Sequence, residues 1–329
     1  MSGAKLSVAV IGVGEHGRNH AAHYKSMGGV ELGGVYDLRP DRRNQVAEEL
    51  GVRPFSSLEE VWRSVQAASI VIPAVDHAAV ARQAFERGVD ILLEKPIART
   101  VEEAGEITRL AAANGCILQV GHVERFNPGV VAAKAITRRP LFFEIHRLGV
   151  FSPRSLDVDV VFDLMIHDLD LVLWLVESSL REVRAVGLPV LSDKVDIANA
   201  RLEFDSGAVA NLTASRVSTE KVRKFRYFQP HEYVSIDFTR RDVLVVNADQ
   251  REGQPQINFR KLETRPAEPL RAEIEAFVEC VRSRRPPLVG GVEGQKALAA
   301  AAQVMSQIEA HAGQVKLSLT RPPGQSGES

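Results

Sequence analysis

The chain has 329 residues, which is enough for two ordinary domains that each bury a sizeable core. Its 41 basic and 42 acidic residues give a formal net charge of −1, which argues against a nucleic-acid-binding protein, since such proteins usually carry a strong basic excess. Hydrophobic residues make up 45% of the chain and charged residues 25%, the ordinary composition of a globular protein.

In the first third of the chain, short apolar segments alternate with segments of helical periodicity. The apolar segments lack period-two alternation, as strands buried on both faces do. The predicted strands are 6–11, 30–36, 69–72, 89–93 and 116–120, with a short extra strand at 52–55. The predicted helices are 16–27, 40–50, 77–87 and 101–113. This alternation predicts a parallel, doubly wound sheet.

After about Val120 the pattern changes to many strands with few helices. The predicted strands are 141–149, 183–188, 195–204, 208–217, 223–228, 233–238 and 243–247, and the predicted helices are 159–176, 269–284 and 294–311. Turn signals such as Asp205-Ser206-Gly207 join several of these strands, which favours one mostly antiparallel sheet. We therefore expect a dinucleotide-type domain over 1–121 and an α+β domain over 122–320. The Pro-, Gly- and Ser-rich tail over 321–329 is predicted to be disordered.

A glycine-rich turn follows the first predicted strand, in the run Gly12-Val13-Gly14-Glu15-His16-Gly17. The first glycine allows a tight turn, the second lets backbone approach a pyrophosphate, and the third lets the next helix pack close to the strand. The start of that helix offers N–H donors and a positive dipole end to phosphates. Its place between a strand and a helix makes this motif a candidate dinucleotide site.

Asp37 ends the second predicted strand, near the place expected for an acid that bonds the ribose hydroxyls of a dinucleotide. A carboxylate there repels a 2′-phosphate, which favours NAD over NADP. Two alternatives remain: Asp37 opens a turn before Pro40, or the nearby Arg39 and Arg42 bind a 2′-phosphate.

The buried strand 89–93 runs directly into Glu94-Lys95-Pro96. The carboxyl ends of strands in an open parallel sheet form the ligand crevice, so Lys95 is a candidate for proton transfer. The alternative is a lysine whose charged end reaches solvent from the surface.

Polar side chains recur on one face of the otherwise apolar helix predicted at 159–176. Asp163, His167 and Asp170 stand at i, i+4 and i+7, so we expect them to face a polar cleft. A histidine there can exchange a proton near neutral pH. The alternatives are a structural helix acid beside a satisfied histidine, or a metal site, for which nothing else in the sequence completes a shell.

Histidines also share one face of the first helix, at positions 16, 20 and 23, but packing roles are expected there and no metal site is predicted anywhere. The sequence holds 2 cysteines, Cys116 and Cys280, too far apart in the chain to suggest a disulfide framework. No run of about 18 apolar residues occurs, so no membrane span is expected. A reducing, cytoplasmic setting fits these features best.

The glycine turn, Glu94-Lys95-Pro96 and the Asp163…His167…Asp170 helix together resemble the glucose-fructose oxidoreductase/inositol dehydrogenase (Gfo/Idh/MocA) family over nearly the whole chain. The resemblance implies a Rossmann domain followed by an α/β domain with a large open sheet. It also implies NAD(P)-dependent oxidation of a sugar or polyol hydroxyl.

The resemblance assigns roles to individual residues of this chain. Lys95 and His167 become the acid/base pair, Asp163 orients the substrate, and the Lys95–Pro96 bond is expected to be cis. Three further residues match the loop that lines the cofactor after the fourth strand: Pro73, Ala74 and His77. Ile72 stands where the family usually has threonine, which puts that contact in doubt. Glu94 is assigned to the cofactor site with Lys95.

Within the family, the run from Gln119 to Pro128 is most similar to a bacterial branch that oxidises the 3-hydroxyl of UDP-N-acetylglucosamine on the way to amino-sugar lipid A. That likeness implies substrate contacts from His122, Arg125 and Asn127, beside those from Lys95, Asp163 and His167. The partners implied are a sugar or nucleotide sugar and further copies of the chain, as a homodimer or homotetramer, but no nucleic acid or membrane.

Other functions remain open at this level. The chain could oxidise inositol or another free sugar or polyol, or it could be a non-catalytic relative that senses NAD. Reduction of a bilin or a small aldehyde is a further alternative, although such relatives often alter the Asp-His helix, which is whole here.

Overall fold

The computed structural model describes residues 5–151, 158–251, 254–264 and 267–315. The chain divides into two compact units, which we describe separately. Unit 1 takes Met1–Phe126 and Ala267–Leu298, and unit 2 takes Asn127–Pro266 and Ala299–Ser329. No helix among the described ranges is both long enough and apolar enough to cross a membrane.

Unit 1 contains a six-stranded sheet in the order β3-β2-β1-β4-β5-β6, and all of its neighbouring strands are parallel. The strands are β1 (Leu6–Ile11), β2 (Val30–Tyr36), β3 (Arg53–Pro54), β4 (Ala67–Ile70), β5 (Asp90–Glu94) and β6 (Leu118–Gly121). The helices are α1 (Glu15–Ser26), α2 (Pro40–Leu50), α3 (Leu58–Ser64), α4 (His77–Glu86), α5 (Val101–Ala113) and α8 (Pro269–Ser283), with short 3₁₀ turns at Ala74–Asp76 and Val123–Phe126. This is the strand order of a Rossmann fold, so the predicted doubly wound sheet is confirmed.

The predicted ends of α2 agree with the structure because the sequence marks both of them. Pro40 occupies the first helical position, and Gly51 closes the helix with φ +59°. α3 was not predicted, although its hydroxyl cap gives a local signal: the Ser57 side chain accepts a hydrogen bond from the Glu60 N–H. Its seven residues are too few to show a clear helical period.

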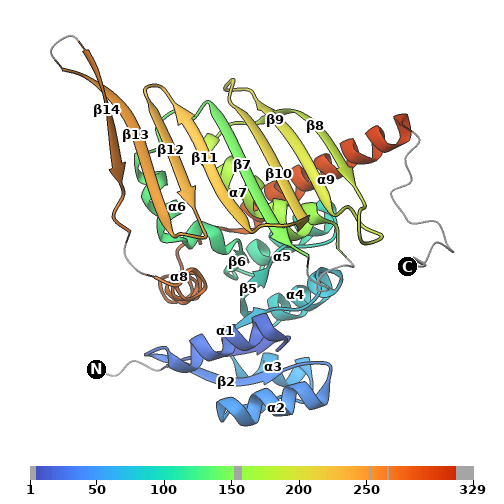
Figure 1. Cartoon of the computed structure of the whole chain (residues 1–329). Helices are drawn as coiled ribbons and strands as arrows, with labels where there is room; N and C mark the ends of the chain where they lie inside the picture. The colour runs from blue at the N-terminus through green and yellow to red at the C-terminus, as the bar shows by residue number, and fades with distance from the viewer. Residues whose placement is uncertain (1–4, 152–157, 252–253, 265–266, 316–329) are drawn as a thin grey trace. The chain divides into compact units, whose positions relative to one another are not determined.

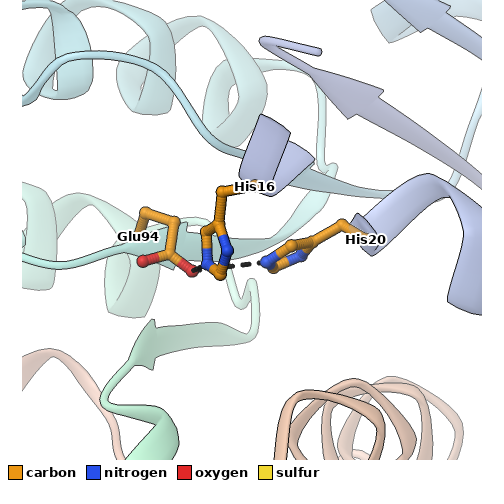
Figure 2. Close-up of side chains that lie close together, drawn as sticks. All are labelled: His16, His20 and Glu94. Atoms are coloured by element: carbon orange, nitrogen blue, oxygen red, sulfur yellow. Dashed lines mark hydrogen bonds and ion pairs between the residues drawn. The ribbon is translucent and has the colours of Figure 1, made fainter. Parts of the chain in front are cut away.

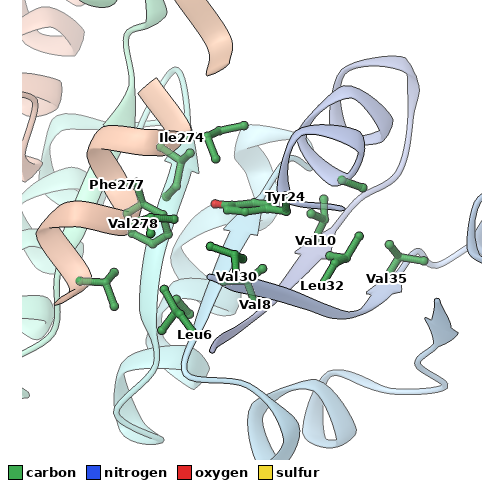
Figure 3. Packing of buried hydrophobic residues seen from close by; sticks show 14 of the residues in the cluster. Leu6, Val8, Val10, Tyr24, Val30, Leu32, Val35, Ile274, Phe277 and Val278 are labelled. Carbon is green, nitrogen blue, oxygen red and sulfur yellow. The ribbon is translucent and has the colours of Figure 1, made fainter. Parts of the chain in front are cut away.

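The core of unit 1 brings α8 against β1, β2 and α1 (Figure 3). From α8, Ile274, Phe277 and Val278 join a buried cluster that also holds Tyr24 and Val8. Packing therefore places 267–298 in unit 1, whereas the predicted domain boundary at 121/122 left that segment in the second domain. A helix distant in sequence can complete a core, and hydrophobic periodicity alone does not show which core it joins.

Unit 2 contains an eight-stranded sheet in the order β14-β13-β12-β11-β7-β10-β9-β8 (Figure 1). The strands are β7 (Phe142–Val150), β8 (Leu180–Leu188), β9 (Ile197–Phe204), β10 (Val209–Ser218), β11 (Val222–Gln229), β12 (Glu232–Asp237), β13 (Asp242–Arg251) and β14 (Gln254–Lys261). Only β7 and β10 pair in parallel; the other described pairs are antiparallel, which confirms the predicted sheet type. The helices are α6 (Pro128–Ile136), α7 (Ile166–Val176) and the second part of α9 (Gly291–Gln314).

Three features of unit 2 differ from the sequence prediction. α6 and β14 were not predicted, and the helix predicted at 159–176 begins as a π-helix over Val161–Met165 before α7. A π turn carries no distinct sequence period, so hydrophobic spacing reads it as α-helix. The tail predicted at 321–329 lies outside the described residues.

Candidate active site

The glycine turn between β1 and α1 has the backbone geometry that its spacing predicts. Gly12 adopts φ +83°, and a Cβ on Gly17 would lie 1.8 Å from the Gly12 carbonyl oxygen, so both positions require glycine. Gly14 stands at the N-cap position of α1 and, as a glycine, has no side chain to cap the helix. Among the described residues beyond its chain neighbours, a Cβ at Gly14 would meet only Arg42 Nη1, at 3.4 Å. An open backbone at the start of a helix fits the pyrophosphate of a dinucleotide.

Asp37 is joined to this turn by hydrogen bonds. Its Oδ2 accepts the Val13 N–H at 3.0 Å, and its Oδ1 accepts the Arg39 N–H at 2.9 Å. The contact with Arg39 forms the turn before Pro40 that was the alternative role of Asp37. The contact with Val13 also holds the carboxylate beside the glycine turn. Since a carboxylate offers about four acceptor sites, capacity remains for ribose hydroxyls.

The strand end at Glu94 and Lys95 meets the first turns of α1. Glu94 Oε1 accepts a hydrogen bond from His16 Nε2 at 3.0 Å, and His20 Nε2 lies 3.3 Å from the same oxygen (Figure 2). Glu94 Oε2 accepts the backbone N–H of Lys95 at 3.2 Å. The Lys95–Pro96 bond is cis, as the family resemblance implied. The carboxylate thus links the helix of the glycine turn to the backbone of the candidate catalytic lysine.

Burial and pairing act in opposite directions on the charges of this cluster. The hydrogen bond to Glu94 raises the pKa of His16, whereas burial lowers the pKa of His20. Burial alone would raise the pKa of Glu94, but its contacts with both histidines hold that pKa well below its usual range. Glu94 is therefore a carboxylate near neutral pH.

The loop after β4 is also tied to the lysine segment. Pro73 precedes a 3₁₀ turn that begins at Ala74, and α4 begins at His77. The buried His77 ring has Nε2 2.9 Å from the Ile72 carbonyl and Nδ1 3.2 Å from the Ile97 carbonyl. His77 thus connects the loop to the backbone beyond Pro96, and direct contact between this loop and the cofactor stays a prediction.

The residues assigned to the substrate from the run 119–128 divide between the two units. His122 and Arg125, in unit 1, are 1% and 4% exposed. His122 directly precedes the 3₁₀ turn Val123–Phe126, and Arg125 lies within it. Asn127, in unit 2, caps α6 by accepting the Gly129 N–H at 3.0 Å. The structure thus gives Asn127 a structural contact, while its predicted substrate contact stays a prediction.

Asp163 lies in the π-helical turn of unit 2, and His167 lies in the first turn of α7. Both side chains are half-buried, whereas Asp170 is 1% exposed. Of the predicted polar stripe, Asp163 and His167 are therefore partly exposed and Asp170 is buried. π turns inside helices frequently occur at functional sites.

Sequence reasoning missed a buried ion pair beneath this helix. Arg147 of β7 donates to both carboxylate oxygens of Asp168, Nε to Oδ2 at 2.8 Å and Nη2 to Oδ1 at 2.8 Å. The pair fixes the residue next to His167 against the sheet. The sequence did place Arg147 at a core-facing position of a predicted strand. A buried charge there requires a partner, so this position could have indicated the ion pair.

Comparison with known proteins agrees with this geometry. The model of an oxidoreductase family with an NAD-binding Rossmann fold, Gfo/Idh/MocA, matches residues 6–122, and the model of that family's C-terminal domain matches 133–229. UDP-N-acetylglucosamine 3-dehydrogenase from Acidithiobacillus ferrooxidans is 39% identical over 93% of this chain and 98% of its own length. The solved structure of that enzyme superposes with a TM-score of 0.87.

More distant relatives share the architecture. scyllo-Inositol 2-dehydrogenase (NAD⁺) from Bacillus subtilis is 28% identical over 88% of this chain and 90% of its own length. Levoglucosan dehydrogenase in complex with NADH is 19% identical and superposes with a TM-score of 0.84, which shows the common fold.

Fold and glycine turn together define an oxidoreductase with an NAD-binding Rossmann domain. The chain belongs to the Gfo/Idh/MocA family, so the predicted family, fold class and cofactor are confirmed.

Proposed function

We propose that this chain oxidises the 3-hydroxyl of UDP-N-acetylglucosamine with NAD as the hydride acceptor. The observation that carries the proposal is its 39% identity, over nearly the full length of both chains, to a dehydrogenase of that substrate. The inositol dehydrogenases share less sequence, at 28% identity for the Bacillus subtilis enzyme. The likeness of the run from Gln119 to Pro128 to the same branch supports the proposal.

The chemistry assigned to the chain is removal of one proton and one hydride from a secondary alcohol. When bound, NAD supplies the nicotinamide carbon that accepts the hydride. A ring nitrogen of His167 takes the hydroxyl proton, and the Lys95 ammonium donates a hydrogen bond to the same oxygen as negative charge develops there. Asp163 accepts a hydrogen bond from the sugar and orients the reacting carbon.

This assignment gives the handling of the hydroxyl proton to Lys95 and His167. We expect Lys95→Ala and His167→Ala each to slow single-turnover reduction of NAD about 10²–10⁴-fold, the usual contribution of general acid–base catalysis. NAD binding should remain mostly intact, since the glycine turn and Asp37 are expected to supply the main contacts to the pyrophosphate and the adenine ribose. Wild-type single-turnover rates in the His167 variant would overturn the assignment.

The substrate is tested by supplying NAD with one candidate at a time and following the absorbance of NADH. We expect turnover with UDP-N-acetylglucosamine and little with free N-acetylglucosamine, myo-inositol or scyllo-inositol. Faster turnover with an inositol would favour the alternative polyol dehydrogenase. Binding of NAD without turnover of any of them would favour a sensing role.

The remaining parts of the proposal concern context. We place the enzyme in the cytoplasm, on a route to amino-sugar lipid A, because its UDP-sugar substrate and few cysteines suit that compartment. We also propose a homodimer or homotetramer formed through the open sheet of unit 2. Its uncovered face carries a cross-strand row of Phe142, Phe228 and Tyr233, and such apolar patches mark protein interfaces.

A further inference from the structure

Two histidines and one carboxylate of unit 1 converge at the end of β5. One ring nitrogen of His16, one ring nitrogen of His20 and one carboxylate oxygen of Glu94 all lie within 4.8 Å of one another. The histidines stand one turn apart on α1, and Glu94 ends β5, so two secondary structure elements aim three metal-binding atoms at one point (Figure 2).

The separations suit a small tetrahedral ion. Metal–ligand distances of about 2.0–2.1 Å place neighbouring ligands of a tetrahedron about 3.3 Å apart. Glu94 Oε1 lies 3.0 Å from the Nε2 of His16 and 3.3 Å from the Nε2 of His20. Two edges of the tetrahedron are therefore close to their final length before any ion enters.

The buried histidine gives a second, independent observation. His20 is fully buried, and its Nε2 forms no hydrogen bond within the described residues, although it lies 3.3 Å from Glu94 Oε1. A buried ring nitrogen that faces a carboxylate but makes no hydrogen bond to it can bind a third atom, such as a metal ion, together with that carboxylate. A buried polar atom that makes no hydrogen bond and binds no ion costs free energy, because it has lost its contact with water.

The surroundings of His20 are those of a metal ligand. Its other ring nitrogen, Nδ1, lies 3.2 Å from Ser69 Oγ, which lies 2.9 Å from the Tyr24 hydroxyl. A proton on Nδ1, donated to Ser69, leaves the Nε2 lone pair directed toward Glu94, and metal-binding histidines are commonly oriented in this way. A Cβ at Gly121 would lie 2.8 Å from Glu94 Oε1, so glycine at that position leaves room for the carboxylate.

We propose that His16, His20 and Glu94 form a binding site for a divalent transition-metal ion of the zinc class. Two imidazoles and one carboxylate are a known three-ligand set for Zn²⁺, with the fourth position left to water. The His16 side chain is 50% exposed, so an ion can enter from its side. A bound ion would join the first turn of α1 to the strand end that precedes Lys95.

This proposal departs from the sequence prediction, which expected no metal here. That prediction counted only the histidines of one helix, and His23 in fact pairs with Glu268 at 3.1 Å instead of joining the cluster. Glu94, the carboxylate that completes the three ligands, is distant in sequence from the two histidines, so no local sequence spacing predicts the cluster.

The test is a Co²⁺ titration of the full chain, freed of metal with a chelator and without added nucleotide. Four-coordinate Co²⁺ gives intense visible absorption bands; we expect them to saturate at one ion per chain and to disappear when Zn²⁺ is added. His16→Ala and Glu94→Gln should each weaken Co²⁺ binding by about 10-fold or more, while Ser69→Ala should weaken it by roughly 10-fold through loss of orientation.

His23→Ala is the matched control, since it removes a histidine from the same helix outside the cluster. It should bind Co²⁺ as the wild type does. Absence of the visible bands in the wild type would overturn the proposal, as would an equal loss of binding in His23→Ala and His16→Ala. Because His16 is half exposed, its alanine variant is expected to fold, which thermal unfolding will check.

Discussion

Asp37 has a structural role in the glycine turn, and we expect the same carboxylate to recognise the cofactor ribose. Its oxygens accept the backbone N–H groups of Val13 and Arg39, so it fixes the glycine turn while it remains at the edge where the ribose is expected. Loss of Asp37 should therefore affect both the shape of the turn and the choice of cofactor.

We expect the wild type to bind NAD more tightly than NADP. Asp37→Ala should reduce the difference between the two affinities. The variant should lose about 10- to 150-fold in NAD affinity, since hydrogen bonds to a charged group contribute about 1.5–3 kcal/mol. NADP affinity should change less, because repulsion of the 2′-phosphate is removed at the same time. Titration of both nucleotides measures this, with Asp41→Ala on the exposed start of α2 as the control. Equal or better use of NADP by the wild type would contradict the assignment.

His77 gives the folded chain a defined response to acid. Its folded pKa lies below the ordinary 6.5 because the ring is buried. Between these two values the unfolded chain binds one proton more than the folded chain. The stabilising contribution of neutral His77 is thus present above pH 6.5 and is lost as pH falls through the folded pKa, by at most about 1.4 kcal/mol per pH unit.

We expect the free energy of unfolding to decline more steeply below pH 6.5 in the wild type than in His77→Gln. The variant should be less stable at pH 7.5, since it loses the packing of the buried ring and the one hydrogen bond that a neutral ring can donate, to the Ile72 or the Ile97 carbonyl. Urea unfolding between about pH 7.5 and pH 5.5 compares the two slopes. Other titrating groups are common to both proteins, so parallel curves would show that His77 does not titrate as inferred.

At the scale of elements, the Asp-His helix shows what hydrophobic spacing can and cannot predict. The apolar period located a helix at 159–176 but gave no sign that it begins as a π turn over Val161–Met165. Periodicity also cannot reveal that Asp168, adjacent to His167, pairs with Arg147 of a distant strand. That pair anchors the helix that carries Asp163 and His167.

Replacing only one member of the Arg147–Asp168 pair should lower the free energy of unfolding considerably. The two side chains are 4% and 3% exposed, so Asp168→Leu removes the carboxylate to which the buried Arg147 guanidinium donates two hydrogen bonds. We expect a loss of about 3–5 kcal/mol in the free energy of unfolding, while the double variant Arg147→Met/Asp168→Leu should recover most of it. Urea unfolding measures both.

The exposed pair of Arg184 and Glu182 serves as the control for that comparison. Glu182→Gln should change the free energy of unfolding by at most about 1 kcal/mol, as is usual for surface ion pairs. A similarly small effect in Asp168→Leu would mean that the buried pair does not hold the helix.

For the molecule as a whole, the sequence predicts best what is encoded locally. The Rossmann half follows from strand–helix alternation and from a glycine turn in which Gly12 and Gly17 each have a distinct steric reason. Contacts between distant segments could not be predicted. Nothing near Glu94 in sequence indicates His20, and nothing near α8 shows that it packs on Tyr24. The added strand β14 likewise depends on pairing with β13.

The open sheet of unit 2 offers the surface for the proposed self-association. Phe228 pairs across strands with Phe142 and Tyr233, and its ring lies 5.5 Å and 4.8 Å from theirs. The same row continues to Val246 and to Phe259, which is 70% exposed. Neighbouring residues on the opposite face, such as Phe143 and Tyr227, are buried, so one face of the sheet is packed while the other carries uncovered aromatic side chains.

We expect the wild type to behave as a dimer or tetramer in size-exclusion chromatography with light scattering, and Phe228→Asp to shift it to monomer. A buried, unpaired carboxylate at the centre of such an interface costs several kcal/mol, enough to dissociate it at micromolar concentration. Val131→Asp is the matched control, because Val131 is an exposed apolar residue on α6, 51% accessible, outside the aromatic row. It should keep the wild-type mass. A monomeric wild type, or an unchanged mass in a folded Phe228→Asp variant, would place self-association elsewhere or exclude it.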